Sequence, residues 1–150
     1  LRGMGTTIAG ILVVEDGVLI AHVGDSRVYR LREGELEQLT EDHSLLNDYL
    51  RQRKLTAAEA EAFPHKNVIV RALGMKPAVE VDLVREELRD GDVVLLCCDG
   101  LSGMVSDPHI GDIIRASHGD LRRAGQTLVD AANQAGGVDN ITCVLVAVSR

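Results

Sequence analysis

Short apolar runs separated by turn sequences dominate the first 40 residues of the chain. One β-branched run ends at Glu15-Asp16-Gly17, and another segment alternates apolar and polar residues before Glu33-Gly34. Alternation with a period of two, bounded by such turns, is typical of antiparallel strands. The pattern predicts an antiparallel β meander whose strands cover residues 6–14, 18–23, 28–32 and 36–39.

The middle of the chain, residues 42–66, is polar and helix-prone. Thr56 and Glu59 have the spacing of a capping box, and Pro64 is expected to end the short helix that they begin. Alternation returns over residues 79–84, and residues 93–98 are apolar throughout. The second of these runs is predicted to be a central strand, because both of its faces must be buried.

Two helices and a strand are predicted in the last third. Asp107 is the expected N-cap of the first helix, with Pro108 as its first helical residue, and this helix is expected to bury Ile110, Ile113 and Ile114. Apolar residues at helical spacing run from Leu121 to Ala135 and stop at Gly136-Gly137. Residues 141–148 form the last strand, which is expected to be buried. The elements form one α+β unit of sheets covered by helices.

The composition favours a soluble protein with a core of aliphatic residues. Of the 150 residues, 45% are hydrophobic and 26% are charged, but only Tyr29, Tyr49 and Phe63 are aromatic. Scarce aromatic residues and a net charge of −7 argue against a nucleic-acid partner. No run reaches the length of a membrane span, and no signal peptide is visible.

Three cysteines, Cys97, Cys98 and Cys143, lie in apolar runs without a C-x-x-C spacing. An odd number in such surroundings indicates reduced, buried thiols and a cytoplasmic protein. The chain begins with Leu1 rather than methionine and enters a strand almost at once, so we expect it to begin within a domain.

The strongest candidates for chemistry are Asp25, Asp99 and Asp139, each in a turn at the end of an apolar strand. Carboxylates at such rims are the oxygen ligands that hard divalent cations prefer, which points to Mg²⁺ or Mn²⁺ and to chemistry on a phosphate. The simpler interpretation of each is a turn residue, since Asp-Gly and Gly-Asp pairs are common in turns.

Other polar residues have a structural interpretation beside a functional one. Asp42-His43 could be a general acid or a metal pair, but an element that orders the loop before a helix is favoured. Arg27 could clamp a phosphate, although a structural role is favoured. The remaining histidines lack metal-ligand spacing and are predicted to be surface or loop residues: His22, His65, His109 and His118.

Six short motifs in order give the chain a resemblance to the metal-dependent protein phosphatases, the type 2C serine/threonine family, in its bacterial form. They are Met4-Gly5-Thr6-Thr7, Val23-Gly24-Asp25-Ser26-Arg27, Asp42-His43-Ser44, Val70-Arg71-Ala72-Leu73-Gly74, Cys98-Asp99-Gly100-Leu101 and Asp139-Asn140-Ile141-Thr142. Each motif alone is weak evidence, but the ordered set, from residue 4 to residue 142, is specific.

The resemblance implies a four-layer α/β/β/α sandwich of two antiparallel sheets flanked by helices. It implies that Asp99 is a central catalytic ligand shared by two metal sites, that Asp139 completes the main site and that Asp25 holds an accessory ion. Two or three Mn²⁺ or Mg²⁺ ions would activate a water for in-line attack on phosphorus. The implied substrates are phosphoserine and phosphothreonine in proteins, opposing a serine/threonine kinase in signal transduction.

The match has two departures. Val70 replaces a threonine, and the family's N-terminal third, with a Glu-Asp pair, a phosphate-binding arginine and an Asp-Gly-Met-Gly-Gly motif, has no counterpart in the chain; Arg2 stands where that aspartate is expected. Residues 1–150 are therefore predicted to be the C-terminal two thirds of one catalytic domain, and the activity is assigned to the parent domain.

Two alternative functions are open from the residues alone: a phosphatase-like, non-catalytic regulatory or binding module, and a phosphatase of small molecules on the same scaffold. In the family, the region corresponding to residues 44–66 is a variable flap beside the active site, which is predicted to tune substrate choice.

Overall fold

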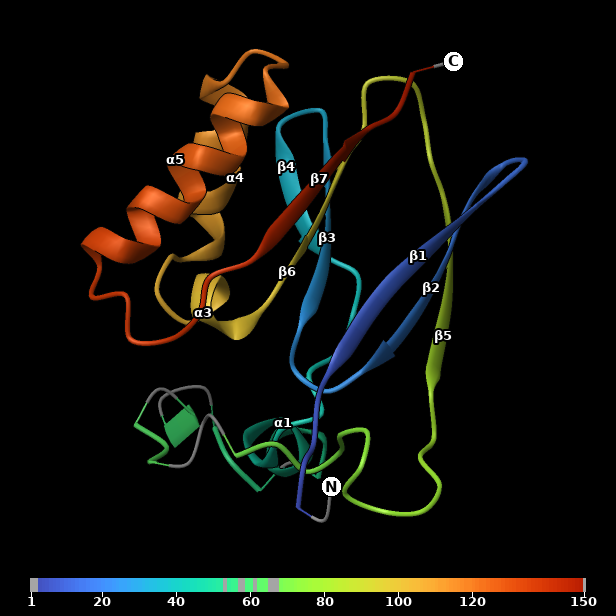
Figure 1. The fold of residues 1–150 in the computed structure, drawn as a ribbon, viewed down its shortest axis with the longest axis vertical. Coiled ribbons are helices and arrows are strands. Elements are labelled where there is room, and N and C mark those ends of the chain that lie inside the picture. Colours follow the sequence, from blue (N-terminus) through green and yellow to red (C-terminus); the bar gives the residue numbers. More distant parts are fainter. Residues whose placement is uncertain (1–2, 53, 57–58, 61, 65–67, 150) are drawn as a thin grey trace.

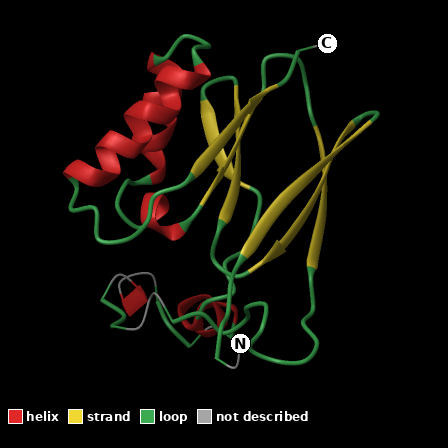
Figure 2. Ribbon diagram, viewed as in Figure 1, coloured by secondary structure: helices red, strands yellow, loops and turns green. Residues whose placement is uncertain are grey.

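Two antiparallel sheets pack face to face, and two helices cover the outer side of one of them (Figures 1 and 2). The structure is a computed structural model that describes residues 3–52, 54–56, 59–60, 62–64 and 68–149. This arrangement confirms the predicted α+β fold of two antiparallel sheets flanked by helices.

The smaller sheet has the strand order β1-β2-β5, from β1 (Ile8–Val14), β2 (Gly17–Val23) and β5 (Asp82–Glu87). The hairpin of β1 and β2 turns at residues 15–16, as predicted. β5 begins three residues later than the predicted strand over 79–84. Its register pairs Asp82 with His22, and β2 ends one residue further on, so the residues before Asp82 have almost no partner strand.

The larger sheet has the order β4-β3-β6-β7, from β3 (Arg27–Arg32), β4 (Glu35–Gln38), β6 (Val93–Cys97) and β7 (Cys143–Ala147). The predicted central place of β6 is confirmed. The predicted continuous meander is wrong, because the chain changes sheets between β2 and β3. The expected burial of β7 is also wrong: this strand is last in its sheet, and its Val144 is 53% exposed.

Helices α4 (Asp107–Ala116) and α5 (Leu121–Gln134) lie on the larger sheet, on the side away from β1, β2 and β5 (Figure 1). α4 buries Ile110, Ile113 and Ile114, as predicted, but its N-cap is Ser106 rather than Asp107. Pro108 is therefore the second helical residue, where the missing N–H costs nothing because first-turn donors have no partner within the helix.

Two separate clusters of buried side chains stabilise the fold. Tyr29, Leu95, Ile110 and Leu128 belong to the cluster between the larger sheet and its helices. The second cluster fills the space between the sheets. Neighbouring residues of β3 and β6 point into different clusters, which explains why the sequence of β6 is apolar on both faces. The members of the second cluster are Val18, Ile20, Val28, Leu88 and Val94.

The outer face of the smaller sheet is apolar and exposed. Ile8 is 48% exposed, and Leu12 and Leu83 are each 63% exposed. Among the described residues no helix lies on this face (Figure 1). None of the helices in the described ranges is long and apolar enough to cross a membrane.

A helical segment lies at the end of the sheets, below them in Figure 1. Its α1 (Leu45–Arg51) is capped by Ser44, whose side chain accepts from the Asn47 N–H. The capping box is confirmed, because the Thr56 N–H donates to the Glu59 carboxylate over 2.7 Å and the Glu59 N–H to Thr56 Oγ1 over 3.4 Å. His65 and parts of the predicted helix over residues 56–63 lie outside the described residues.

The buried Asp92 generates a testable prediction about stability. Its carboxylate accepts from Arg32 Nε and Nη2 and from the Arg89 N–H, and the bonds from Arg32 hold the pKa of Asp92 below its ordinary value of 3.8. Asp92→Asn should lower the free energy of unfolding by about 2 kcal/mol at neutral pH, because donors lose a charged, buried acceptor.

The sign of the pH dependence follows from the lowered pKa. The stability from Asp92 is present above its unfolded-state pKa and is lost as the pH falls through the lower folded-state value. Urea unfolding between pH 7 and pH 3 should therefore show that the difference in free energy of unfolding between the two proteins becomes smaller in acid. A difference that stays constant would contradict the ionic role of Asp92.

Candidate metal centre

The three predicted aspartates lie at the same end of the two sheets. Asp25 is in the turn from β2 to β3, and Asp99 begins α3 (Asp99–Ser102) directly after β6. Asp139 is in the loop from α5 to β7, which passes α3 (Figure 1). The three aspartates therefore lie in loops at one end of the sheets, which we call the rim.

The turns that carry Asp99 and Asp139 touch through their backbones. A Cβ on Gly100 would lie 2.1 Å from the Asn140 carbonyl oxygen, so this position requires glycine. Cys98 Sγ lies 3.1 Å from the same oxygen and accepts from the Thr142 N–H over 3.2 Å, and the Cys98 N–H donates to the Thr142 oxygen. The Cys-Asp-Gly motif thus fixes the position of the Asp-Asn-Ile-Thr segment.

The Asp25 turn is fixed by its neighbours in a similar way. Gly24 has a φ of +117°, and a Cβ there would lie 2.3 Å from Thr7 Cγ2. The hydroxyls of Thr7 and Ser26 are hydrogen-bonded at 2.9 Å. Thr7 and Ser26, together with Cys98 and Thr142, line a crevice of about 290 Å³, whose other lining residues are mostly apolar.

Electrostatics link Asp25 to Asp99. Burial raises the pKa of the half-buried Asp25, and the negative charge of Asp99 raises it further. Two carboxylates that repel each other favour a bound cation, and their oxygens suit a hard divalent ion such as Mg²⁺ or Mn²⁺. The donor chemistry therefore fits the predicted metals.

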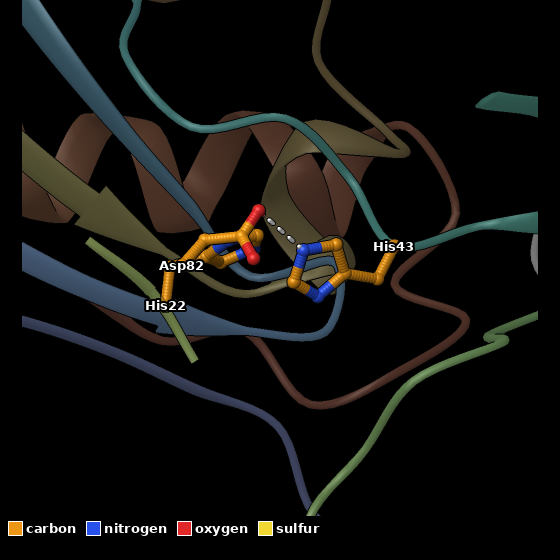
Figure 3. Close-up of side chains that lie close together, drawn as sticks. All are labelled: His22, His43 and Asp82. Carbon is orange, nitrogen blue, oxygen red and sulfur yellow. Dashed lines mark hydrogen bonds and ion pairs between the residues drawn. The ribbon is translucent and has the colours of Figure 1, made fainter. Parts of the chain in front are cut away.

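The structure supports the predicted ligand set only in part. It brings the backbones of Asp99 and Asp139 together and places Asp25 within electrostatic reach of Asp99. A different set of side chains, His22, His43 and Asp82, has ligand atoms that all lie within 4.8 Å of one another (Figure 3). In the described residues it is the one group of three or more His, Cys, Asp or Glu side chains that does so. The three-aspartate site stays a prediction.

Arg27 has the structural role that the sequence favoured. Its Nε and Nη2 donate to the Asp42 carboxylate at 2.9 and 2.6 Å, and its Nη1 donates to the Tyr29 hydroxyl at 2.9 Å. The Tyr29 hydroxyl in turn donates to Asp107 at 3.0 Å. The guanidinium thus joins the loop before α1 to the larger sheet and to α4.

The predicted surface place of His22 is wrong, because this residue is 1% exposed. The sequence does carry a signal for this. His22 lies two residues after Ile20 and four after Val18, so in a strand all three side chains lie on the same, buried face. His109 and His118 are exposed, as predicted. His43 orders the loop before α1 through contacts with Gly24, which confirms the favoured interpretation of Asp42-His43.

Comparison with known proteins gives consistent matches. A family model described as "Protein phosphatase 2C" matches residues 1–145. Protein phosphatase PhpP of Streptococcus pneumoniae is 44% identical over 149 residues, which cover 99% of this chain and 60% of that protein. The chain therefore spans about 60% of the length of this curated relative.

Solved structures of similar sequence share the fold. The Mycobacterium tuberculosis serine/threonine phosphatase PstP/Ppp superposes with a TM-score of 0.94 at 37% identity, over 100% of this chain and 63% of that one. A structure of the catalytic domain of PstP in complex with two manganese ions matches with a TM-score of 0.87 at 37% identity, over 100% and 61% of the two chains.

The repulsion between Asp25 and Asp99 can be tested directly. In metal-free protein, Asp99→Asn should lower the pKa of Asp25 toward its ordinary value of 3.8, because a neighbouring negative charge is removed. Carbon NMR titration of the Asp25 carboxyl measures the change. The exposed Asp130→Asn on α5 is the control, and an unchanged pKa of Asp25 in the Asp99 variant would show that the charge of Asp99 does not raise it.

Proposed function

Because this chain belongs to the protein phosphatase 2C family, we propose that the protein containing it removes phosphate from serine and threonine residues of proteins, using Mn²⁺ or Mg²⁺. The observation that carries the proposal is the place of Asp25, Asp99 and Asp139 at one rim, where the Asp99 and Asp139 turns touch and the charge of Asp99 raises the pKa of Asp25. The names of PhpP and PstP and the two manganese ions bound to PstP support it.

Each aspartate has a separate role in this proposal. Asp99 is shared by the main and accessory sites, Asp139 completes the main site and Asp25 holds the accessory ion. When bound, such ions supply Lewis-acid activation of water and neutralise charge on phosphoryl oxygens. The raised pKa of Asp25 means that its carboxyl holds a proton more readily in the metal-free protein, so cation binding competes with protonation there.

The proposal also covers the partner enzyme, the cellular process and location, and the domain to which the chain belongs. We include a serine/threonine kinase as the opposing partner, a role in signal transduction and a cytoplasmic location, for which the free thiols of Cys97, Cys98 and Cys143 are supporting evidence. We also include the placement of residues 1–150 within one catalytic domain, which the clusters shared by β3 and β6 support.

Phosphate release from a phosphothreonine peptide tests the function. The protein at its full natural length should be active only with Mn²⁺ or Mg²⁺. Asp99→Asn should reduce kcat about a thousandfold, because several kcal/mol of charge stabilisation is lost and each 1.36 kcal/mol is tenfold in rate. Asp139→Asn should act in the same direction.

Asp130→Asn provides the matched control, since it makes the same chemical change on an exposed part of α5 away from the rim. A folded full-length protein without metal-dependent activity would overturn the enzyme and leave a binding module. Activity on small phosphate esters with none on phosphopeptides would overturn the substrate class alone.

The segment 44–66 generates a separate prediction about substrate choice. Its helix α1 lies at the rim end of the sheets (Figure 1). The rings of Tyr49 and Phe63 pack with centroids 5.5 Å apart. Exchanging this segment for that of a relative should change the ranking of phosphopeptides by kcat/KM but leave the rate on a small phosphate ester unchanged. An unchanged ranking would remove the segment from substrate recognition.

A further inference from the structure

Four polar residues with no role in the proposed chemistry form a connected cluster beside Gly24, the residue before Asp25. They are His22 on β2, His43 just before α1, Arg71 in the loop before β5, and Asp82 at the start of β5. Two of them, His43 and Arg71, belong to the six motifs. Figure 3 shows His43 facing Asp82 beside His22. Their contacts indicate what this cluster does.

Both peptide groups of Gly24 are held by histidine. The Gly24 N–H donates to His43 Nδ1 over 3.0 Å, and the backbone N–H of His43 donates to the Gly24 oxygen over 2.8 Å. His22 Nε2 lies 2.9 Å from the same oxygen. A turn with its N–H and its carbonyl both bound to buried side chains and backbone has little freedom to move, and Asp25 is the next residue.

The contacts also define the protonation of His43. A backbone N–H can only donate, so Nδ1 must present its lone pair and the proton of the neutral ring lies on Nε2. Nε2 lies 3.0 Å from Asp82 Oδ2, which accepts that proton's hydrogen bond. Asp82 is held in turn by Arg71, whose Nη1 donates to Oδ1 over 2.5 Å. Arg71 and Asp82 thus select the form of His43 that binds Gly24.

A metal ion is the other interpretation of this cluster, but the hydrogen bonds that its ligand atoms already make argue against it. Both ring nitrogens of His43 are occupied, Nδ1 by Gly24 and Nε2 by Asp82. The Arg71 guanidinium also lies 3.1 Å from His43 Nε2, where it supplies the positive charge that Asp82 needs. A cation bound by this group would have to displace that guanidinium.

We infer that His43 is a positioning residue for Asp25, which it holds at the rim through Gly24, with Asp82 and Arg71 fixing the ring that makes the contact. The inference rests on the proposed function, since it assumes that Asp25 is a ligand of the accessory ion. Substitution of residues that hold a metal ligand in place typically lowers metal affinity about 10- to 100-fold.

Two substitutions separate the two ends of the His43 ring. In His43→Asn, the side-chain oxygen can occupy the place of Nδ1 and accept from Gly24. In His43→Gln, the amide nitrogen can occupy the place of Nε2 and donate to Asp82, but the acceptor for Gly24 is lost. Calorimetric titration of the full-length protein with Mn²⁺ resolves the component of Mn²⁺ binding that Asp25→Asn removes.

We expect His43→Gln to weaken that component about tenfold or more and His43→Asn to retain most of it. The other Mn²⁺ component should not change. In the double variant with Asp25→Asn, His43→Gln should add no further loss, because both substitutions act on one ligand. Should His43→Gln fail to fold, Asp82→Ala at the partly exposed end of the network should weaken the same component.

Ile114→Val in α4 is the control for general destabilisation, because it loosens the core away from the rim and should leave both components intact. Equal effects of the Asn and Gln variants, an unchanged Asp25-dependent component, or additive losses in the double variant would each overturn the positioning role. If Asp25→Asn and Asp99→Asn themselves leave Mn²⁺ binding unchanged, the proposed metal centre is overturned, and this inference with it.

Discussion

The turn at Gly24 and Asp25 is the constraint on which the rest of the structure depends. Here the chain leaves the smaller sheet and enters the larger one within three residues, between β2 and β3. The step requires the positive φ of Gly24 and leaves no room for a side chain against Thr7. Because β3 begins here and its Arg27 pairs with Cys97 at the end of β6, Asp25 and Asp99 each lie two residues beyond the same register pair.

A second close approach completes the rim in the same physical way. Gly100 allows the backbone after β6 to touch the backbone before β7, where any Cβ would overlap Asn140. Both glycines stand beside an aspartate in the sequence, at Gly24-Asp25 and Asp99-Gly100. Each glycine permits a close approach that a Cβ would block, to the Thr7 side chain at Gly24 and to the Asn140 backbone at Gly100, and each approach fixes the turn that carries the neighbouring aspartate.

The sequence predicted elements and turns well, but not the pairing between elements. Period-two alternation placed β1 to β4 closely, and uniform apolarity identified β6 as central. The same signals could not show that β2 pairs with β5 across some sixty residues, because register is decided by contacts between distant segments. The late start of β5 and the exposure of β7 follow from such pairings, which leave no local trace.

In the candidate site, too, local features could be predicted from the sequence, and contacts between distant segments could not. Asp25, Asp99 and Asp139 could be chosen from local turn chemistry, and the structure gathers their turns at one rim. The role of Asp82 could not be predicted, since it begins as one acidic residue in an alternating run and gains its function only by pairing with His22. His22 itself could have been found, because its place between apolar residues of β2 already indicated the buried face.

The two polar groupings at the rim differ in how their charges are balanced. Around Gly24, the negative charge of Asp82 is matched by Arg71, so the network is complete within the chain and holds its shape without a ligand. At Asp25, burial and the negative charge of Asp99 raise the pKa by more than the positive charge of Arg27 lowers it. A fixed, neutral support beside an unbalanced pair of carboxylates keeps the repulsion from opening the turn. That is the physical condition under which an added cation is bound rather than merely attracted.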